Sequence, residues 1–296
     1  MPVATRHWVV LLVLVALWGS SYLAVSLALS VWRPVEITAL RVLTAALVLI
    51  LAVVAGRHRL PRSLRHWAWF AGIAVVGNCL PFFLISWGQQ RIESGLAGIL
   101  AASTPLVVLI LAHYLLHDER LRPGQAVAFV LGFAGILVLM GPDSLAALGG
   151  SGERLWGQLA VLGGAVCYAV ATVSARFLPP AHPVVTAAGV MLLAGALMSP
   201  VSASALAHLP AAPLPVVAAI GFLGLLGTGI ASILYFHLIE QTGARFTSLL
   251  NYLVPVWAVM LGTLVLGEEL KLTAWLSLAL ILSGLVLMRN SAPGRR

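Results

Sequence analysis

Charged residues are scarce in this sequence of 296 residues, and acidic residues are the scarcest. Asp and Glu number nine and Lys and Arg seventeen, so that 9% of the chain is charged, whereas a soluble domain carries about 25%. So few charges cannot cover a surface that faces water. The composition therefore excludes a soluble globular protein, and the apolar runs that fill the chain leave no room for a sizeable aqueous domain.

Cysteine pairs and metal-binding patterns are also lacking. The two cysteines, Cys79 and Cys167, fall inside apolar runs and form no CxxC motif, so we interpret them as small core residues. No histidine pair stands beside a carboxylate in a recognisable metal pattern, and the Gly-rich stretch 221–229 lacks the context of a phosphate loop. We expect no metal, no cofactor and no catalytic residue.

Hydrophobic residues make up 61% of the chain, and the mean hydropathy is +1.04. About 20 apolar residues are needed to cross a bilayer as a helix. The N-terminal run resembles a signal peptide but continues to Ala28, so we interpret it as an uncleaved helix. The sequence predicts an all-α integral membrane protein with ten transmembrane helices, at 7–28, 35–55, 67–88, 95–116, 123–141, 156–177, 184–203, 214–238, 246–266 and 271–288.

Positive charge is concentrated in alternate connections between these spans. A net charge of +8 would suggest a nucleic-acid partner in a soluble protein, but here it indicates membrane topology. With the N-terminus in the cytoplasm, twelve of the seventeen Lys and Arg residues lie on the cytoplasmic side and four outside, while Arg41 lies within a span. We therefore predict no nucleic-acid partner, a multi-pass protein of the cytoplasmic membrane and two cytoplasmic termini.

The sequence resembles itself at an offset of 150 residues. Gly77 pairs with Gly227, Pro105 with Pro255 and Glu119 with Glu269. Each half, 1–150 and 151–296, contains five spans, so the second half enters the membrane in the opposite sense. This pattern predicts an inverted repeat, and transporters of this plan bind substrate near the bilayer midplane between the repeats.

The residues that carry this pattern resemble the EamA family of the drug/metabolite transporter superfamily. They are the Trp18-Gly19-Ser20-Ser21 segment, Arg41, and the two prolines that precede Asp118-Glu119 and Glu268-Glu269. The resemblance extends over the full chain as two EamA repeats. It implies export across the bacterial inner membrane, and the nearest likeness is to exporters of amino acids, in particular aromatic ones.

The two halves differ where the first half has its distinctive residues. Cys167-Tyr168-Ala169 stands where the first half has Leu17-Trp18-Gly19, and no arginine matches Arg41. We infer a shared scaffold with an asymmetric binding site.

Polar and aromatic side chains recur at helical spacing within several spans. Such groups are costly in a bilayer unless they face partners or water. Ordinary helix packing explains them equally well. As a hypothesis, we place the substrate site at the residues of these faces: Trp18, Ser21, Tyr22, Asn78, Phe82, Tyr168, Thr228, Ser232, Tyr235, Asn251 and Tyr252.

Three prolines and one arginine within the spans suggest further roles. Pro81, Pro105 and Pro255 are candidate hinges. Pro81 removes a backbone hydrogen bond, and Pro105 and Pro255 stand at matching depth in the two halves, where they would bend two related helices. Arg41 is a candidate for binding a substrate carboxylate. Its shallow depth favours a structural role instead, either in an ion pair with Glu36 or with its charged end extended to the outer interface.

Taken together, these features predict a carrier that exports small amphipathic metabolites by alternating access. Amino acids are the favoured substrates, drug-like or other metabolites the first alternative, and a channel or an integral-membrane enzyme the distant ones. No Asp or Glu lies deep in a predicted span, which argues against a built-in carboxylate proton relay. The expected partners are a small-molecule substrate and the lipid bilayer, with the protein a monomer or a weak homo-oligomer.

Overall fold

The computed structural model describes residues 5–116, 123–146 and 152–290, and within these ranges every regular element is a helix. The predicted all-helical membrane architecture is confirmed. Eight helical stretches in the described ranges are long and apolar enough to cross a membrane, and Leu250–Val265 and Leu272–Leu287 are shorter apolar helices. The count of ten transmembrane helices stays a prediction. The Asp118-Glu119 motif lies outside the described residues.

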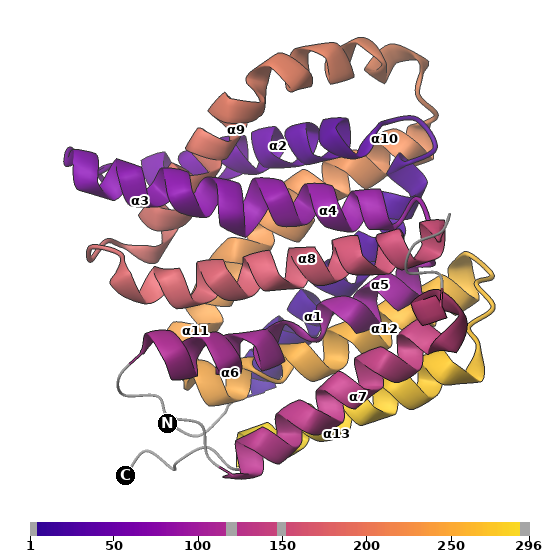
Figure 1. Cartoon of the computed structure of the whole chain (residues 1–296). Coiled ribbons are helices and arrows are strands. Elements are labelled where there is room, and N and C mark those ends of the chain that lie inside the picture. The colour runs from indigo at the N-terminus through magenta and orange to yellow at the C-terminus, as the bar shows by residue number, and fades with distance from the viewer. Residues whose placement is uncertain (1–4, 117–122, 147–151, 291–296) are drawn as a thin grey trace.

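The first half of the chain forms eight elements, some of which follow one another without a loop (Figure 1). They are α1 (Thr5–Ala28), α2 (Pro34–Ala55), α3 (Leu64–Ala74), the π-helical segment η1 (Val75–Cys79), α4 (Leu80–Gly88), α5 (Ser94–Ala101), α6 (Thr104–Leu115) and α7 (Pro123–Ala146).

The second half has a similar order of elements. They are α8 (Glu153–Ser174), η2 (Ala175–Phe177), α9 (Pro183–Ala207), η3 (Leu209–Ala211), α10 (Leu214–Gly221), the π-helical segment η4 (Phe222–Ile230), α11 (Ala231–Thr247), α12 (Leu250–Val265) and α13 (Leu272–Asn290). Pro34 and Pro183 stand at the first position of α2 and α9, where the missing N–H of proline has no helical partner to lose.

The principal packing partners come from opposite halves of the chain. α2 packs against α9, α7 against α13, α4 against α8, and α1 against α12. The α7–α13 pair lies along one edge of the molecule in Figure 1. Where α4 meets α8, Gly88 and Gly157 allow a close approach, because a Cβ on Gly88 would lie 2.6 Å from Val161 Cγ2. The halves are thus interleaved.

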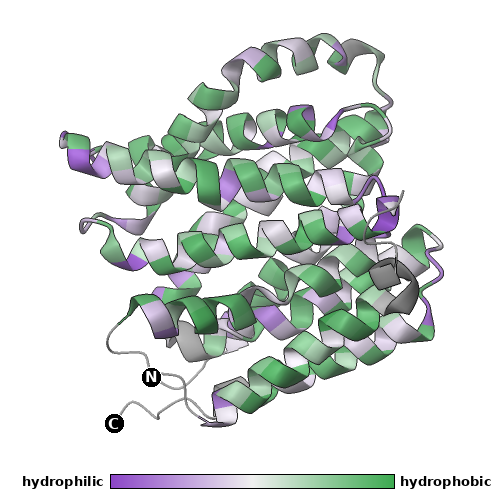
Figure 2. Cartoon of the chain, viewed as in Figure 1, coloured by the Kyte–Doolittle hydropathy of each residue, from purple (hydrophilic) through white to green (hydrophobic). Residues whose placement is uncertain are grey.

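Large apolar side chains lie on the outside of the bundle as well as in its core. Leu51 and Val54 on α2 are each 67% exposed, and hydrophobic colour dominates the helices in Figure 2. An apolar outer surface is suited to lipid rather than water. The buried core includes side chains from both halves, such as Leu96 and Leu100 with Val259 and Ile281.

The two prolines predicted to bend matching helices, Pro105 and Pro255, lie in different local structures. The fourth predicted span is interrupted by a turn at Ala102–Ser103, directly before Pro105. Ser103 Oγ and Thr104 Oγ1 donate to the carbonyls of Leu100 and Ala101, at 2.6 and 2.8 Å. Pro255, in contrast, lies inside the continuous helix α12. The two proline positions therefore differ in structure.

Candidate functional site

A cavity of about 380 Å³ lies between the two halves of the chain. The residues that line it come from α1, α2, η1, α4, α5, α6, α8, η4, α11 and α12, and from the turns that follow α4 and α5. They are Trp18, Ser21, Tyr22, Val25, Arg41, Asn78, Phe82, Ile85, Ser86, Gln89, Gly98, Ala101, Ala102, Thr104, Tyr168, Thr172, Gly227, Thr228, Ser232, Leu250, Asn251, Val254 and Pro255.

Aromatic rings form a large part of the cavity wall. Trp18, Tyr22, Phe82 and Tyr168 all line it, and the rings of Phe82 and Tyr168 meet edge to face with centroids 6.4 Å apart. Such rings offer apolar surface and, in the tyrosines, a polar end. The wall therefore suits a solute with an apolar group.

Arg41 reaches this cavity from α2. Its Nε donates a hydrogen bond of 2.8 Å to Thr228 Oγ1, and its guanidinium carbon lies 3.8 Å from the centroid of the Phe82 ring. Phe82 is itself buried. The guanidinium thus stacks on an aromatic face and is fixed by a residue from the other half of the chain.

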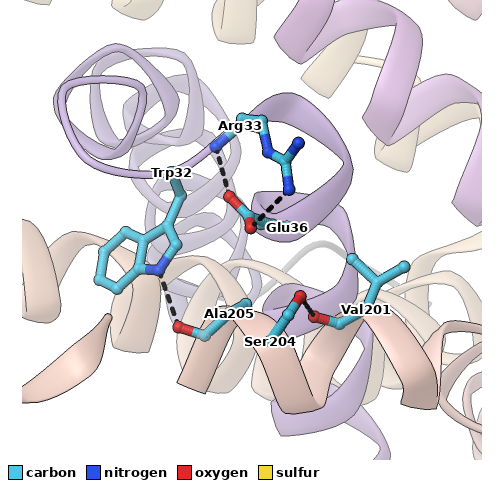
Figure 3. A network of polar contacts seen from close by, with 6 residues as sticks. All are labelled: Trp32, Arg33, Glu36, Val201, Ser204 and Ala205. Carbon is cyan, nitrogen blue, oxygen red and sulfur yellow. Dashed lines mark hydrogen bonds and ion pairs between the residues drawn. The ribbon is translucent and has the colours of Figure 1, made fainter. Parts of the chain in front are cut away.

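Arg41 does not form the ion pair with Glu36 that was one of its two suggested structural roles. Glu36 instead accepts hydrogen bonds from Arg33, at 2.9 Å from the backbone N and at 3.2 Å from Nη2 (Figure 3). Beside it, Trp32 Nε1 donates to the carbonyl of Ala205 at 3.1 Å. The first turn of α2 satisfies its own carboxylate, so Arg41, which begins the third turn, is available to the cavity.

The two π-helical segments present corresponding polar groups. Asn78 Nδ2 donates to the carbonyl of Ile73 at 3.2 Å, and Thr228 Oγ1 donates to that of Leu223 at 2.8 Å. Each bond spans five residues, and the two bonds are 150 residues apart in sequence. π-helical turns are frequent at functional sites. Both Asn78 and Thr228 line the cavity.

Several lining residues were not predicted from the sequence, and Gln89 is the clearest example. Its Nε2 donates to the carbonyl of Tyr22 at 2.9 Å and to Ser26 Oγ at 3.2 Å, which connects the end of α4 to α1. Ser86, Thr104 and Thr172 also line the cavity. Ser86, Thr104 and Thr172 lie on predicted spans and Gln89 directly follows one, and only the packing of those spans reveals which way these polar residues face.

Most of the hypothesised site residues are brought together in this cavity. Tyr235 and Tyr252 are the exceptions among the eleven. The Tyr235 ring lies 5.3 Å from that of Trp18, so it packs beside a lining residue, and the Tyr252 hydroxyl donates to the carbonyl of Leu285 on α13. Of the three candidate hinges only Pro255 lines the cavity, and Pro81 and Pro105 do not.

Polar contacts join the two halves at the end of the bundle that contains residues 89–94 and 266–271. The Glu268 carboxylate accepts from the backbone N of Ser94 at 2.7 Å and of Gly95 at 2.9 Å, at the start of α5. Arg154 pairs with Glu93 at 2.8 Å. A helix N-terminus favours such a carboxylate, so these contacts hold this end of the bundle together.

Within the described ranges, no group of three His, Cys, Asp or Glu residues is placed to hold a metal ion.

Comparison with known proteins places the chain among membrane transporters. The model of the EamA-like transporter family matches residues 6–141 and 155–290. The chain is 30% identical over 282 residues to the "uncharacterized inner membrane transporter YedA" of Escherichia coli K12, which covers 94% of this chain and 89% of the relative. It is 24% identical over 271 residues to the "uncharacterized transporter YoaV" of Bacillus subtilis, with 91% of each covered.

Two further matches bear on activity and fold. A relative from Streptantibioticus cattleyicolor, named "probable terminal-alkyne amino-acid exporter", is 24% identical to this chain over 297 residues. The alignment covers 100% of this chain and 97% of the relative. A solved crystal structure superposes with a TM-score of 0.64 at 25% identity, over 96% of this chain and 97% of its own.

Proposed function

This chain belongs to the EamA-like transporter family, and we propose that it exports small amphipathic metabolites through the central cavity by alternating access. Amino acids, aromatic ones included, are the first substrate class. The observation that carries the proposal is the cavity itself, which combines aromatic walls with hydroxyl and amide groups and lies between the two halves. Such a lining suits solutes that carry both an apolar and a polar part.

The names of the relatives support transport rather than catalysis. YedA and YoaV are both named transporters, and the S. cattleyicolor relative is named as an exporter of an amino acid. At 24% identity that relative supports amino acids as a class for this chain, and no single one. Drug-like metabolites are the alternative substrates.

We propose the same architecture as the sequence predicts: two inverted five-helix repeats, 1–150 and 151–296, with both termini in the cytoplasm of a bacterial cell and the helices in its inner membrane. Two observations support it. The family model matches once in each half, and the chief helix pairs each combine one helix from each half. We propose that the protein acts as a monomer or a weak homo-oligomer.

The substrate contacts we propose are the predicted residues that line the cavity. Trp18, Tyr22, Phe82 and Tyr168 would contact the apolar group, and Ser21, Asn78, Thr228, Ser232 and Asn251 would offer hydrogen bonds. Tyr235 would act indirectly, by holding Trp18 in place. Pro81 and Pro105 would act as hinges beside η1 and the turn at Ala102–Ser103, and Pro255 as a wall residue.

Flux from proteoliposomes preloaded with the twenty amino acids tests this proposal. We expect saturable efflux of a subset rich in aromatic or branched members, accelerated by the same solute on the opposite side. Parallel runs with and without a proton gradient would show whether transport is coupled. If folded protein moves no amino acid, the substrate class is wrong, and drug-like solutes should be assayed next. Flux that never saturates would favour a channel.

A further inference from the structure

We propose that Arg41 binds a carboxylate of the substrate and that a substrate's ammonium group is dispensable for recognition. This inference rests on the proposed function, because it assumes that the central cavity holds the transported solute. It narrows the substrate class to small apolar monocarboxylates, with amino acids as one subset of that class.

The wall of the cavity carries little charge. Among the described residues that line it, Arg41 is the only charged one, and no Asp or Glu joins it there. The structure shows no ion pair of Arg41 with any described residue, whereas Arg33 and Arg154 each have a carboxylate partner. A half-buried cation without a counter-ion is unfavourable, so an anionic occupant would be stabilised at this position.

The hydrogen bonds around Thr228 show which atoms of Arg41 remain available. The Thr228 hydroxyl has one proton, which it donates to the carbonyl of Leu223. Its oxygen then accepts from Arg41 Nε. This arrangement uses the Nε–H and leaves the terminal Nη1 and Nη2 groups, for which the structure shows no hydrogen bond to a described residue. These donors form the planar pair that binds a carboxylate through two parallel hydrogen bonds.

The ring of Phe82 restricts the guanidinium further. Arg41 lies over one face of this buried ring, with its guanidinium carbon 3.8 Å from the centroid. The stacking leaves the edge of the guanidinium plane as the direction for hydrogen bonding. Thr228 and Phe82 therefore orient Arg41 before a ligand binds. We expect a smaller loss of side-chain entropy on binding than for a freely moving arginine.

The single positive charge of Arg41 favours anions that carry one negative charge. A phosphate monoester carries about −1.5 to −2 charges near neutral pH, and a single guanidinium cannot balance it. A monocarboxylate carries one charge and matches the planar geometry of Arg41. The aromatic walls around Arg41, including Tyr22 and Tyr168, then suit an apolar group attached to that carboxylate.

The single positive charge in the cavity wall also disfavours a specific site for an ammonium group. The α-ammonium of an amino acid lies next to its carboxylate and would therefore lie near Arg41, which repels it. Among the lining residues in the described part of the chain, no carboxylate compensates for this repulsion. Tyrosine rings and hydroxyl groups can tolerate an ammonium, so amino acids still bind, but the group contributes little to affinity.

Three matched ligands test the proposal by calorimetric binding to the purified full chain in detergent. 3-Phenylpropionate carries the carboxylate alone, L-phenylalanine adds the ammonium, and 3-phenylpropanamide replaces the carboxylate by a neutral group of the same shape. We expect 3-phenylpropionate to bind at least as tightly as phenylalanine. We expect 3-phenylpropanamide to bind at least tenfold more weakly, as for the loss of hydrogen bonds to a charged group.

Two variants test whether Arg41 causes the preference for 3-phenylpropionate over 3-phenylpropanamide. Arg41→Gln should remove the preference for 3-phenylpropionate over the amide, and Arg41→Lys should retain only part of it, because lysine keeps the charge but lacks the two-pronged geometry. Melting temperatures without ligand show whether each variant is folded. If Arg41→Gln does not fold, Arg41→Lys and Phe82→Leu carry the test, and both should reduce the preference severalfold.

Each outcome has a definite meaning. Equal binding of 3-phenylpropionate and 3-phenylpropanamide would overturn the proposal, as would an unchanged preference in folded Arg41→Gln. Binding of none of the three ligands would exclude the apolar monocarboxylate class. Because these are binding measurements, they are independent of transport: Arg41-dependent discrimination in a protein that moves no solute would support the carboxylate site and contradict the proposed carrier function.

Discussion

At the scale of single residues, Thr228 connects three features of the site. Its hydroxyl donates to a carbonyl in the π-helical segment η4, accepts from Arg41, and faces the cavity. Asn78 makes the corresponding backbone contact in the first half. Met191, however, stands 150 residues after Arg41, so Asn78 has no matching arginine to orient. The scaffold is repeated, whereas the charged group is not.

Replacing Thr228 by valine keeps the shape of the side chain and removes the oxygen that Arg41 contacts. We predict that Thr228→Val weakens the binding of carboxylate ligands about tenfold, because the guanidinium loses a charge-assisted hydrogen bond that orients it. The binding of 3-phenylpropanamide should change little, since that ligand has no charge to place on Arg41.

Thr172→Val is the matched control for this prediction. Thr172 also lines the cavity, and its hydroxyl donates to the carbonyl of Tyr168 in its own helix at 2.7 Å. Its loss should alter carboxylate binding less than twofold. Equal effects of the two variants on both kinds of ligand would show that Thr228 does not act through Arg41.

The sequence predicted the general identity of the lining but not the direction of each side chain. Helical spacing places Tyr235 on the same face as Ser232, yet the Trp18 ring packs against it. Tyr252 neighbours Asn251, yet its hydroxyl bonds to α13. Gln89 stands at the end of a span, where polarity suggests an interfacial residue, and its contact with α1 depends on packing between helices.

At the scale of elements, the sequence predicted where helices run better than how they are interrupted. Apolar length and prolines at the first helical position indicate the starts of α2 and α9. The π-helical segments η1 and η4 are invisible to such patterns, because their extra residue per turn is stabilised by particular side chains such as Asn78 and Thr228. Periodicity alone treats each as a continuous α-helix.

The junction between α5 and the loop before α13 gives a prediction about stability. We expect Glu268→Gln to destabilise the protein by about 1–3 kcal/mol, because the charged acceptor for two backbone N–H groups becomes a neutral amide. The melting temperature in detergent should fall by a few degrees. A Cβ on Gly262 would lie 2.2 Å from Glu268 Oε2, so the amide also has little room to reorient.

Glu269→Gln is the control, since Glu269 is the adjacent carboxylate, is exposed, and has no ion pair to a described residue. Its melting temperature should match that of the unmodified chain. A similar loss in both variants would indicate a general effect of charge on this loop rather than a specific contact with α5.

The interrupted fourth span gives a prediction about transport rate. Replacing Pro105 by alanine restores a backbone N–H beside the turn at Ala102–Ser103, which favours a continuous helix. We predict that Pro105→Ala slows transport more than it changes substrate affinity. Pro255→Ala, within continuous α12, should affect the rate less. Unchanged transport in the double variant would contradict a hinge at either proline.

At the scale of the whole molecule, the helices of the two halves are interleaved, and we expect the cavity to open by movement of these helices relative to one another. Contacts of Glu268 with α5 and of Glu93 with Arg154 secure one end of the bundle. In the proposed topology, with both termini in the cytoplasm, this is the outer end, because the predicted third span, 67–88, separates it from the cytoplasmic segment around residue 59. We therefore expect a resting state whose cavity is reached from the cytoplasm.

The most direct test is the accessibility of one cysteine in the cavity, in a chain whose Cys79 and Cys167 are replaced by alanine. Ser232→Cys reports on the cavity, while Arg59→Cys and Glu269→Cys mark the two ends of the bundle. We predict that a membrane-impermeant thiol reagent labels residue 232 from the cytoplasmic side only at rest, and that substrate gradients shift labelling towards the outer side. Simultaneous labelling from both sides would contradict alternating access and indicate a channel.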